Sequence, residues 1–251
     1  MNTPRPRHRA PEVIVAEDAA EAGRLAARVV LDAVAASPAA VLGLATGSSP
    51  LPLYAALAAS GADFSEVSGF ALDEYIGLPD GHPQSYAEVI RTEVVERLGL
   101  DPARVRTPDP HGADHAEHER RADDYDAAIA AAGGVDVQIL GVGSNGHIGF
   151  NEPPSAFDSR TRVVPLAEST RRDNARFFDG LDEVPTECIT QGIATIMEAR
   201  HLLLIAHGAR KAEAVRRALQ GPVTEDFPAS IVQRHPRVTV VLDREAAALL
   251  G

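Results

Sequence analysis

The sequence predicts an α/β fold of one domain, Rossmann-like, with a mostly parallel central sheet flanked by helices. From residue 12 onward, short apolar runs rich in β-branched residues alternate with longer alanine-rich segments of helical period, which is typical of βαβ units. No repeat, low-complexity tract or Pro/Ser-rich linker divides the 251 residues, so residues 11–251 are expected to form a single domain. Residues 1–10, MNTPRPRHRA, are expected to form a flexible N-terminal arm.

The apolar runs predict the strands, and the segments of helical period between them predict the helices. Strands are expected at residues 12–16, 40–45, 67–72, 135–141, 201–207 and 237–243. Helices are expected at residues 19–36, 50–60, 85–98, 114–132, 186–199, 208–220 and 243–250, with Thr186 as an N-cap. Residues 145–165 are expected to form an irregular loop, because glycine, proline, serine and asparagine crowd that segment.

Composition excludes several functional classes. The chain has 24 Lys and Arg against 36 Asp and Glu, a formal net charge of −12, with 4% aromatic residues and no Trp. No nucleic-acid partner is expected, because such a surface needs a basic face with stacking platforms. No apolar run reaches the roughly 18 residues of a membrane span. Since Cys188 is the only cysteine and no secretory signal opens the chain, a cytoplasmic protein without a membrane partner is expected.

The loops that follow the strands are the expected ligand sites, because open parallel sheets bind ligands at the carboxyl ends of their strands. Thr46, Gly47, Ser48 and Ser49 follow the strand at residues 40–45 and lead into a helix. Small residues let backbone N–H groups approach an anion, hydroxyls add donors, and a helix N-terminus carries about half a positive charge. The pattern indicates an anion cradle, although a tight turn accounts for it equally well.

Cations follow a later strand. Lys211 begins the helix expected at residues 208–220, and Arg176 lies on a further helical segment. A cation in the first helical turn opposes the helix dipole at a cost of about 0.3–1 kcal/mol, so an anionic ligand would explain Lys211. A solvated basic patch is the alternative.

Candidates for proton transfer follow two other strands. Asp73 comes directly after residues 67–72, where a carboxylate can act as a general base, although taken alone a helix cap or solvated turn explains it better. GVGSNG at residues 141–146 matches the pattern G-x-G-x-x-G, but the HIGFNEPP that follows forbids the helix of a dinucleotide site. The loop is expected instead to present His147 and Glu152 to a small ligand.

Two further signals are weaker. His111, His115 and His118 alternate with acidic residues, but a solvated helix face explains them better than a metal, and no metal is expected. The nucleophile motif G-x-S-x-G is absent, and Cys188, expected inside an apolar helix, is interpreted as a packed, inert thiol. Taken together, the loops suit a small-molecule partner, a phosphorylated sugar that undergoes proton transfers.

Seven segments, in order and at similar spacing along nearly the whole chain, resemble the glucosamine-6-phosphate deaminases. They are LGLATGSSP at 42–50, LDEYIGLP at 72–79, HPQSY at 82–86, GVGSNGHIGFNEP at 141–153, SRTR at 159–162, NARFF at 174–178 and GARK at 208–211. The resemblance implies conversion of D-glucosamine 6-phosphate and water into D-fructose 6-phosphate and ammonia, without metal or organic cofactor. It further implies a hydrolase of amino-sugar catabolism.

The resemblance also implies roles for individual residues. Asp73 would take the proton from sugar C2 and return it at C1, while His147 drives ring opening with help from Glu152 and Asn145. The phosphate would be held by Thr46, Gly47, Ser48, Ser49, Arg176 and Lys211. The well-known form of the family has Asp where this chain has Asn145, and Asn is expected to support a protonated histidine less because it adds no charge.

The regulated form of the family responds to N-acetylglucosamine 6-phosphate at a subunit interface. Ser155 and Arg162 match that second site, but Val164 and Pro165 stand where the family has Lys and Thr. No such activation is therefore expected. The oligomeric state is left open by the sequence, which allows a homo-oligomer.

Three alternatives stay open. A 6-phosphogluconolactonase would share the fold and the phosphate site but would need no base at C2, so Asp73 and the NEPP segment discriminate against it. A deaminase of another hexosamine phosphate would differ in contacts to one stereocentre. A regulatory sugar-phosphate-binding module would keep the cradle and lose Asp73, His147 and Glu152.

Overall fold

A seven-stranded sheet forms the centre of the chain in the computed structural model, which describes residues 10–251. The sheet has the order β1-β10-β9-β6-β2-β3-β5, and all its neighbouring strands run parallel. The strands are β1 (Glu12–Ala16), β2 (Val41–Leu44), β3 (Ser68–Ala71), β5 (Val105–Arg106), β6 (Val137–Leu140), β9 (Leu202–Ala206) and β10 (Val238–Asp243). The predicted α/β class with a mostly parallel sheet is confirmed. The arm predicted at residues 1–10 lies, apart from Ala10, outside the described residues.

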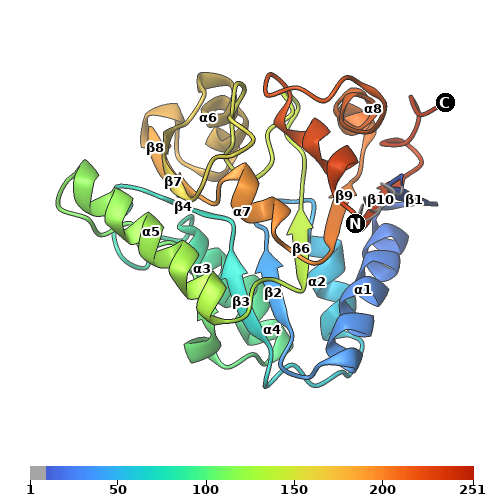
Figure 1. The fold of residues 1–251 in the computed structure, drawn as a ribbon, viewed down its shortest axis with the longest axis horizontal. Helices are drawn as coiled ribbons and strands as arrows, with labels where there is room; N and C mark the ends of the chain where they lie inside the picture. The colour runs from blue at the N-terminus through green and yellow to red at the C-terminus, as the bar shows by residue number, and fades with distance from the viewer. Residues whose placement is uncertain (1–9) are drawn as a thin grey trace, which may run out of the picture.

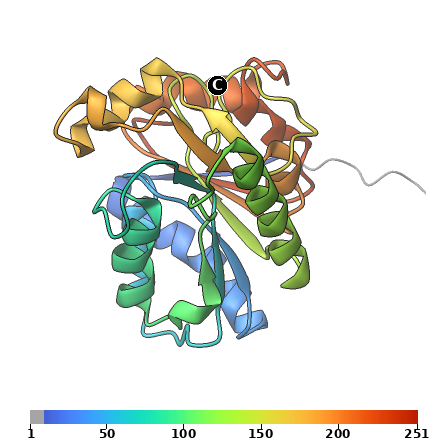
Figure 2. The same cartoon turned by 90° about the vertical axis from the view of Figure 1, so that its left-hand side faces the viewer.

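Helices cover both faces of this sheet (Figures 1 and 2). The α-helices are α1 (Ala19–Ala36), α2 (Leu51–Ala58), α3 (Tyr86–Ile90), α4 (Glu96–Leu98), α5 (His115–Ala131), α6 (Glu168–Asn174), α7 (Ile193–Met197) and α8 (Ala212–Gln220). A π-helical turn, η1 (Arg91–Val95), joins α3 to α4, so the helix predicted at residues 85–98 is continuous. Short 3₁₀ turns are η2 (Pro102–Arg104), η3 (Ala175–Phe177), η4 (Leu181–Glu183), η5 (Ala209–Lys211) and η6 (Pro228–Arg234).

A second, antiparallel sheet lies at the carboxyl edge of the first, beside α6 (Figure 1). It has the order β4-β8-β7 and consists of β4 (Asp73–Tyr75), β8 (Glu187–Thr190) and β7 (Arg162–Pro165). The sequence analysis did not predict this sheet. Its strands have three or four residues each, too few for an alternating pattern to be recognised.

The helix predicted at residues 186–199 is wrong in its first half. Residues 187–190 form β8, where Cys188, Ile189 and Thr190 are fully buried, and the helix α7 begins only at Ile193. The β-branched Ile189 and Thr190 suit the strand that pairs with both β4 and β7. Thr186 is consequently not an N-cap, and Cys188 lies in a strand, where burial raises the pKa of its thiol and keeps it protonated.

Two other expectations need correction. Residues 243–250 form turns and not a helix, and the carboxylate of Asp243 accepts the N–H groups of Ala246 at 2.7 Å and Gly208 at 2.9 Å. The loop predicted at residues 145–165 is irregular for most of its length but ends in β7. The side chain of Asp243 thus connects the end of β10 to the turn after β9.

The core fills the space between the parallel sheet and its helices. Leu203 and Leu204 of β9 and Val240 and Val241 of β10 are completely buried. A smaller apolar cluster lies at the second sheet and contains Tyr75, Phe150, Val164, Leu166 and Cys188. Among residues 10–251, no helix combines the length and the apolar character that crossing a membrane would require.

Candidate active site

The cradle predicted at residues 46–49 lies between β2 and α2. Gly47 has φ +82°, a left-handed conformation that glycine adopts without steric cost, and space is open around the position of a Cβ there. No side chain caps the N-terminus of α2. Its first N–H groups and the hydroxyls of Thr46, Ser48 and Ser49 are therefore available to an anion.

Two further loops meet this cradle. Ser49 lies against Gly141 after β6, since a Cβ placed on Gly141 would be 3.8 Å from the Ser49 Oγ. The Nζ of Lys211 donates to the backbone oxygen of Val142 at 2.8 Å. Lys211 comes from the turn after β9, so the structure brings the loops that follow β2, β6 and β9 to one place.

Lys211 lies in a cationic environment. Burial lowers the pKa of Lys211, the nearby cations of Arg176 and Arg210 lower it further, and Asp173 opposes them. Arg176 lies in η3 with its guanidinium 4.6 Å from the ring centre of Phe177. A bound dianion would relieve the repulsion among these cations, which makes the cluster suitable for a phosphate.

Asp73 opens β4 and is almost completely buried, with 5% of its surface exposed. Burial, and then the adjacent negative charge of Glu74, raise the pKa of Asp73 well above its usual range, while a hydrogen bond from the backbone N–H of Phe150 lowers it. The loop after β6 passes directly over this carboxylate. Gly149, with φ +55°, leaves room for it, because a Cβ there would be 3.3 Å from the Asp73 Oδ2.

His147, Glu152 and Asn145 form a cluster on the same loop. The Nδ1 of His147 lies 3.5 Å from the Oε2 of Glu152, and Asn145 donates its amide to that oxygen at 2.5 Å. Gly143 is required here, because a Cβ would come within 2.3 Å of the imidazole. The sequence prediction that G-x-G-x-x-G at residues 141–146 opens no helix is confirmed.

The environments of Asp73 and Glu152 shift the pKa values of these two carboxyls in opposite directions. Burial raises the pKa of Glu152, but His147, the hydroxyl of Thr170 and the amide of Asn145 lower it more, so its net pKa lies below the usual value. Asp73 has the opposite shift. Two neighbouring carboxylates with opposite pKa shifts provide one group that stays ionised and one that takes up a proton more readily.

Several residues that complete the site were not selected from the sequence. Glu74, Tyr86 and Phe150 lie in the motifs around Asp73 and His147, but nothing in those motifs indicates which backbone groups or rings they contact. Thr170 is buried and contacts Glu152, and Asn174 donates to the Tyr75 hydroxyl at 2.8 Å. These contacts depend on tertiary structure and have no local sequence signal.

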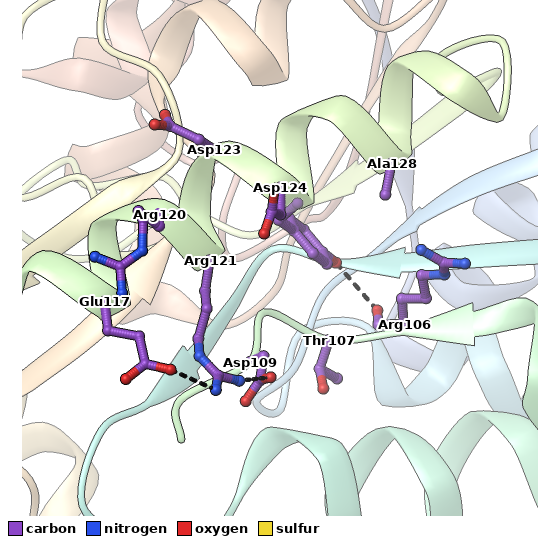
Figure 3. A pocket seen from close by; sticks show the side chains of 10 residues that line it. Arg106, Thr107, Asp109, Glu117, Arg120, Arg121, Asp123, Asp124 and Ala128 are labelled. Carbon is purple, nitrogen blue, oxygen red and sulfur yellow. Dashed lines mark hydrogen bonds and ion pairs between the residues drawn. The ribbon is translucent and has the colours of Figure 1, made fainter. Parts of the chain in front are cut away.

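Other regions carry no comparable arrangement. A cavity of about 640 Å³ between β5 and α5 contains none of the predicted site residues, and its Arg121 already pairs with Glu117 and Asp109 (Figure 3). The three histidines considered for a metal are separated: His111 faces Asp80, while His118 contacts the Pro110 oxygen. Within residues 10–251, no group of three or more His, Cys, Asp or Glu is placed to hold a metal ion.

The fold and the site define an α/β protein with an anion cradle beside buried proton-transfer groups. The model of the family described as glucosamine-6-phosphate isomerases/6-phosphogluconolactonase matches residues 15–241. The chain belongs to this family.

Curated relatives cover nearly the full length of the chain. It is 55% identical to a glucosamine-6-phosphate deaminase of Pseudarthrobacter chlorophenolicus over 242 residues, which cover 95% of this chain and 92% of the relative. It is also 55% identical to a glucosamine-6-phosphate deaminase of Bifidobacterium longum over 250 residues, which cover 96% of this chain and 93% of that one.

Solved structures agree with this placement. A monomeric glucosamine-6-phosphate deaminase superposes with a TM-score of 0.91 at 40% identity, covering 95% of this chain and 99% of that one. The 6-phosphogluconolactonase from Trypanosoma cruzi superposes with a TM-score of 0.78 at 21% identity, covering 97% and 99% of the two chains. At that identity the second likeness concerns the fold alone.

The expectation of a hydrolase is wrong. The relatives that match over nearly the whole chain are named as deaminases, and this family branch performs isomerisation with deamination. The hydrolases among the matches are 6-phosphogluconolactonases, which share only about a fifth of their residues with this chain.

Proposed function

We propose that the chain is a glucosamine-6-phosphate deaminase, which converts D-glucosamine 6-phosphate and water into D-fructose 6-phosphate and ammonia. The observation that carries the proposal is the placement of Asp73. Its buried carboxylate, with a raised pKa, lies against the loop that also holds His147, and this loop joins the phosphate cradle. The deaminase relatives support the same substrate.

The substrate phosphate binds at the cradle. The N–H groups and hydroxyls of residues 46–49 receive its oxygens, and Lys211 and Arg176 neutralise its charge. This end of the sugar is fixed, so C1 and C2 are held toward Asp73 and His147. Positioning of this kind can supply several kcal/mol of the catalytic effect.

Ring opening comes first, because the C2 proton becomes acidic only beside a free carbonyl. His147 moves the proton between the C1 hydroxyl and the ring oxygen, while Glu152, ionised and bonded by Asn145, orients the imidazole. A well-placed acid or base of this type contributes roughly 10²–10⁴ in rate.

Proton transfer at carbon follows. Asp73 takes the proton from C2 and delivers it to C1, while a proton of the amino group passes to the C1 oxygen, so the carbonyl becomes a hydroxymethyl group and an imine remains at C2. Water adds to the imine, ammonia leaves, and the ketone of fructose 6-phosphate remains. The raised pKa of Asp73 suits this role, because a carboxyl with an increased proton affinity holds the C2 proton more readily until it is returned at C1.

The same proposal covers compartment and assembly. We place the enzyme in the cytoplasm, which its single buried cysteine supports. Its partner is a small sugar phosphate. A homo-oligomer is compatible with this site, whose described contacts join the loops after β6 and β9.

The test is product formation by the purified protein. With glucosamine 6-phosphate we expect equimolar ammonia and fructose 6-phosphate, with little turnover of galactosamine 6-phosphate and none of 6-phosphogluconolactone. Hydrolysis of the lactone without ammonia release from the amino sugar would overturn the proposal in favour of the lactonase. Faster turnover of galactosamine 6-phosphate would correct the stereochemical preference.

A further inference from the structure

A single carboxylate, that of Glu74, binds backbone N–H groups at both ends of the loop between β4 and α3. Glu74, 1% exposed, accepts the backbone N–H of Tyr75 at 2.7 Å and of Tyr86 at 2.9 Å through Oε1. Its Oε2 accepts the N–H of Ala87 at 2.6 Å. Burial raises the pKa of Glu74, and the three donors oppose this shift because they favour the ionised carboxylate. One side chain thereby joins both ends of the segment at residues 75–86.

The two tyrosines tied in this way belong to an aromatic wall formed by Tyr75, Tyr86 and Phe150. The rings of Tyr75 and Tyr86 lie 4.7 Å apart between centroids, and Phe150 lies 5.5 and 5.6 Å from them. Phe150 directly follows Gly149, the residue that passes over Asp73. The wall therefore borders the proton-transfer groups.

The aromatic wall also reaches the phosphate end of the site. The hydroxyl of Tyr86 lies 3.3 Å from that of Tyr75 and interacts with the side chain of Thr46 in the cradle. Asn174 donates to the Tyr75 hydroxyl at 2.8 Å and leads directly into the η3 turn that carries Arg176. A shift of either tyrosine would consequently move contacts at both ends of the substrate.

Glu74 itself stays away from the substrate face. Consecutive side chains of a strand point to opposite sides, so Asp73 faces the loop after β6 while Glu74 faces the segment it closes. A cavity of about 350 Å³ lies on that far side of Glu74, between Leu78 and His111. Glu74 must therefore act through the groups it holds.

We propose that Glu74 is a positioning residue of the proposed reaction, which holds the aromatic wall in register with Asp73 and with the phosphate cradle. This inference rests on the proposed function, because it assigns a role within that reaction. Glu74 has a second effect through its charge, which lies next to Asp73 in the chain and favours the protonated form of that carboxyl.

The charge effect offers a readout that a purely structural role would not give. Groups facing Asp73 and Glu74 from neighbouring elements are Tyr75, Tyr86, Tyr125, Cys188 and His111. The pKa values of the three tyrosines and the thiol are raised, so these groups are neutral at neutral pH. His111 acts on Glu74 from the loop after β5. Glu74 is thus the nearest negative charge to Asp73.

Glu74→Gln removes this charge and places an amide N–H against a backbone donor. We expect kcat to fall roughly 10- to 100-fold, as for lost hydrogen bonds to a charged group, with a rise in KM. The acid limb of kcat/KM should move to lower pH, because Asp73 loses the neighbouring negative charge. Glu74→Asp keeps the charge with a shorter reach, so it should lower kcat and leave the acid limb in place.

Glu88→Gln serves as the matched control. Glu88 lies two residues into α3, pairs with Arg91 and touches none of the site groups, so its loss of charge should leave kcat, KM and the pH profile unchanged. Thermal unfolding of each variant establishes that it is folded, and Glu74→Asp retains the test if Glu74→Gln is not.

The outcomes separate the two proposals. If Glu74→Gln keeps the kcat and the acid limb of the wild type, the positioning role is overturned. It is also overturned if both variants lose kcat while the acid limb of Glu74→Gln stays in place, because that result indicates general destabilisation. If the wild-type protein itself releases no ammonia from glucosamine 6-phosphate, the proposed function fails, and the role of Glu74 in that reaction fails with it.

Discussion

The two ends of the site are built in different ways. At the proposed phosphate end, the cradle at residues 46–49 is a short loop with Gly47 and Ser48 exposed, and it offers backbone and hydroxyl donors. At the reacting end, Asp73 and Glu74 are 5% and 1% exposed, and their surroundings come from segments far apart in the chain, among them α3, β8 and the loop after β6. A local loop is enough to bind an anion, whereas tuning a carboxylate requires burial, which only the assembled fold provides.

The largest effect should follow removal of the reacting carboxylate. Asp73→Asn should lower kcat for glucosamine 6-phosphate by at least about 10⁴-fold, because the amide cannot accept the C2 proton. Affinity for a substrate analogue should stay within roughly tenfold, since the phosphate contacts are untouched. Steady-state kinetics and calorimetric titration check this pair of results. Retained turnover would show that Asp73 is not the base, and the reacting end of the site would then not differ from the phosphate end in the way described.

The same variant should be more stable than the wild type at neutral pH. Folding raises the pKa of Asp73. Its carboxyl therefore makes its full contribution to the free energy of unfolding below the pKa of the unfolded chain, about 3.9, and this contribution is lost as the pH rises through the pKa of the folded protein. Asparagine avoids this loss, and each kcal/mol regained raises Tm by about 2–4 °C at this chain length. Thermal unfolding at pH 4 and pH 7.5 should show a gap that widens with pH. A lower Tm in the variant at pH 7.5 would contradict the buried-charge account.

A smaller effect, confined to binding, is expected at the phosphate end. Lys211→Met removes the half-buried cation that reaches the Val142 oxygen, so KM should rise roughly 10- to 100-fold with kcat little changed. Arg216→Met provides the control: it removes the same charge farther along α8, where Arg216 pairs with Glu213, and should change KM about twofold or less. Equal effects in the two variants would mean that the cradle responds to overall charge and not to a specific contact.

A shift in pH dependence is expected at Asn145. In Asn145→Asp, the amide donor to Glu152 is lost and a like charge is added, so the pKa of Glu152 should rise. The pH optimum of kcat should move upward by about one unit. Ser144→Asp adds the same charge at an exposed position of the same loop and should leave the optimum in place. An unchanged optimum in Asn145→Asp would show that position 145 does not tune the imidazole.

The smallest effect is an expected absence of response. Arg162 already donates to Asn151 at 2.9 Å and to Ser155 at 3.4 Å, and Val164 and Pro165 offer no charge beside it. Addition of N-acetylglucosamine 6-phosphate should therefore leave the half-saturation concentration of the substrate unchanged. A clear decrease measured in a rate assay would establish a regulatory site that the chain's own residues do not suggest.

Features carried by contiguous residues could be predicted from the sequence. Six of the seven parallel strands appear as apolar β-branched runs, whereas the two-residue strand β5 was not predicted. The helix α1 is predicted with the bounds it has, because alanine and apolar periodicity persist over all of its 18 residues. The cradle at 46–49 and the loop with His147 likewise have local signals, since small residues and prolines exclude regular structure there.

Features that depend on distant pairing could not be predicted. The register of the second sheet places Asp73 opposite Thr190, 117 positions later in the chain. The strand β4 has only three residues, too few for a recognisable pattern. The partners of Glu74 and the contact between Thr170 and Glu152 arise in the same way. The pKa shifts of Asp73 and Glu152 follow from this packing, so the sequence gives the residue types but not the direction of either shift.

The most direct test is a crystal structure with the open-chain analogue 2-amino-2-deoxyglucitol 6-phosphate. The account predicts phosphate oxygens on residues 46–49 and Lys211, one Asp73 oxygen within about 3–3.5 Å of C2, and the imidazole of His147 at the hydroxyl derived from the ring oxygen. A complex in which the phosphate sits in the cradle but Asp73 and His147 cannot both reach that one molecule would contradict it.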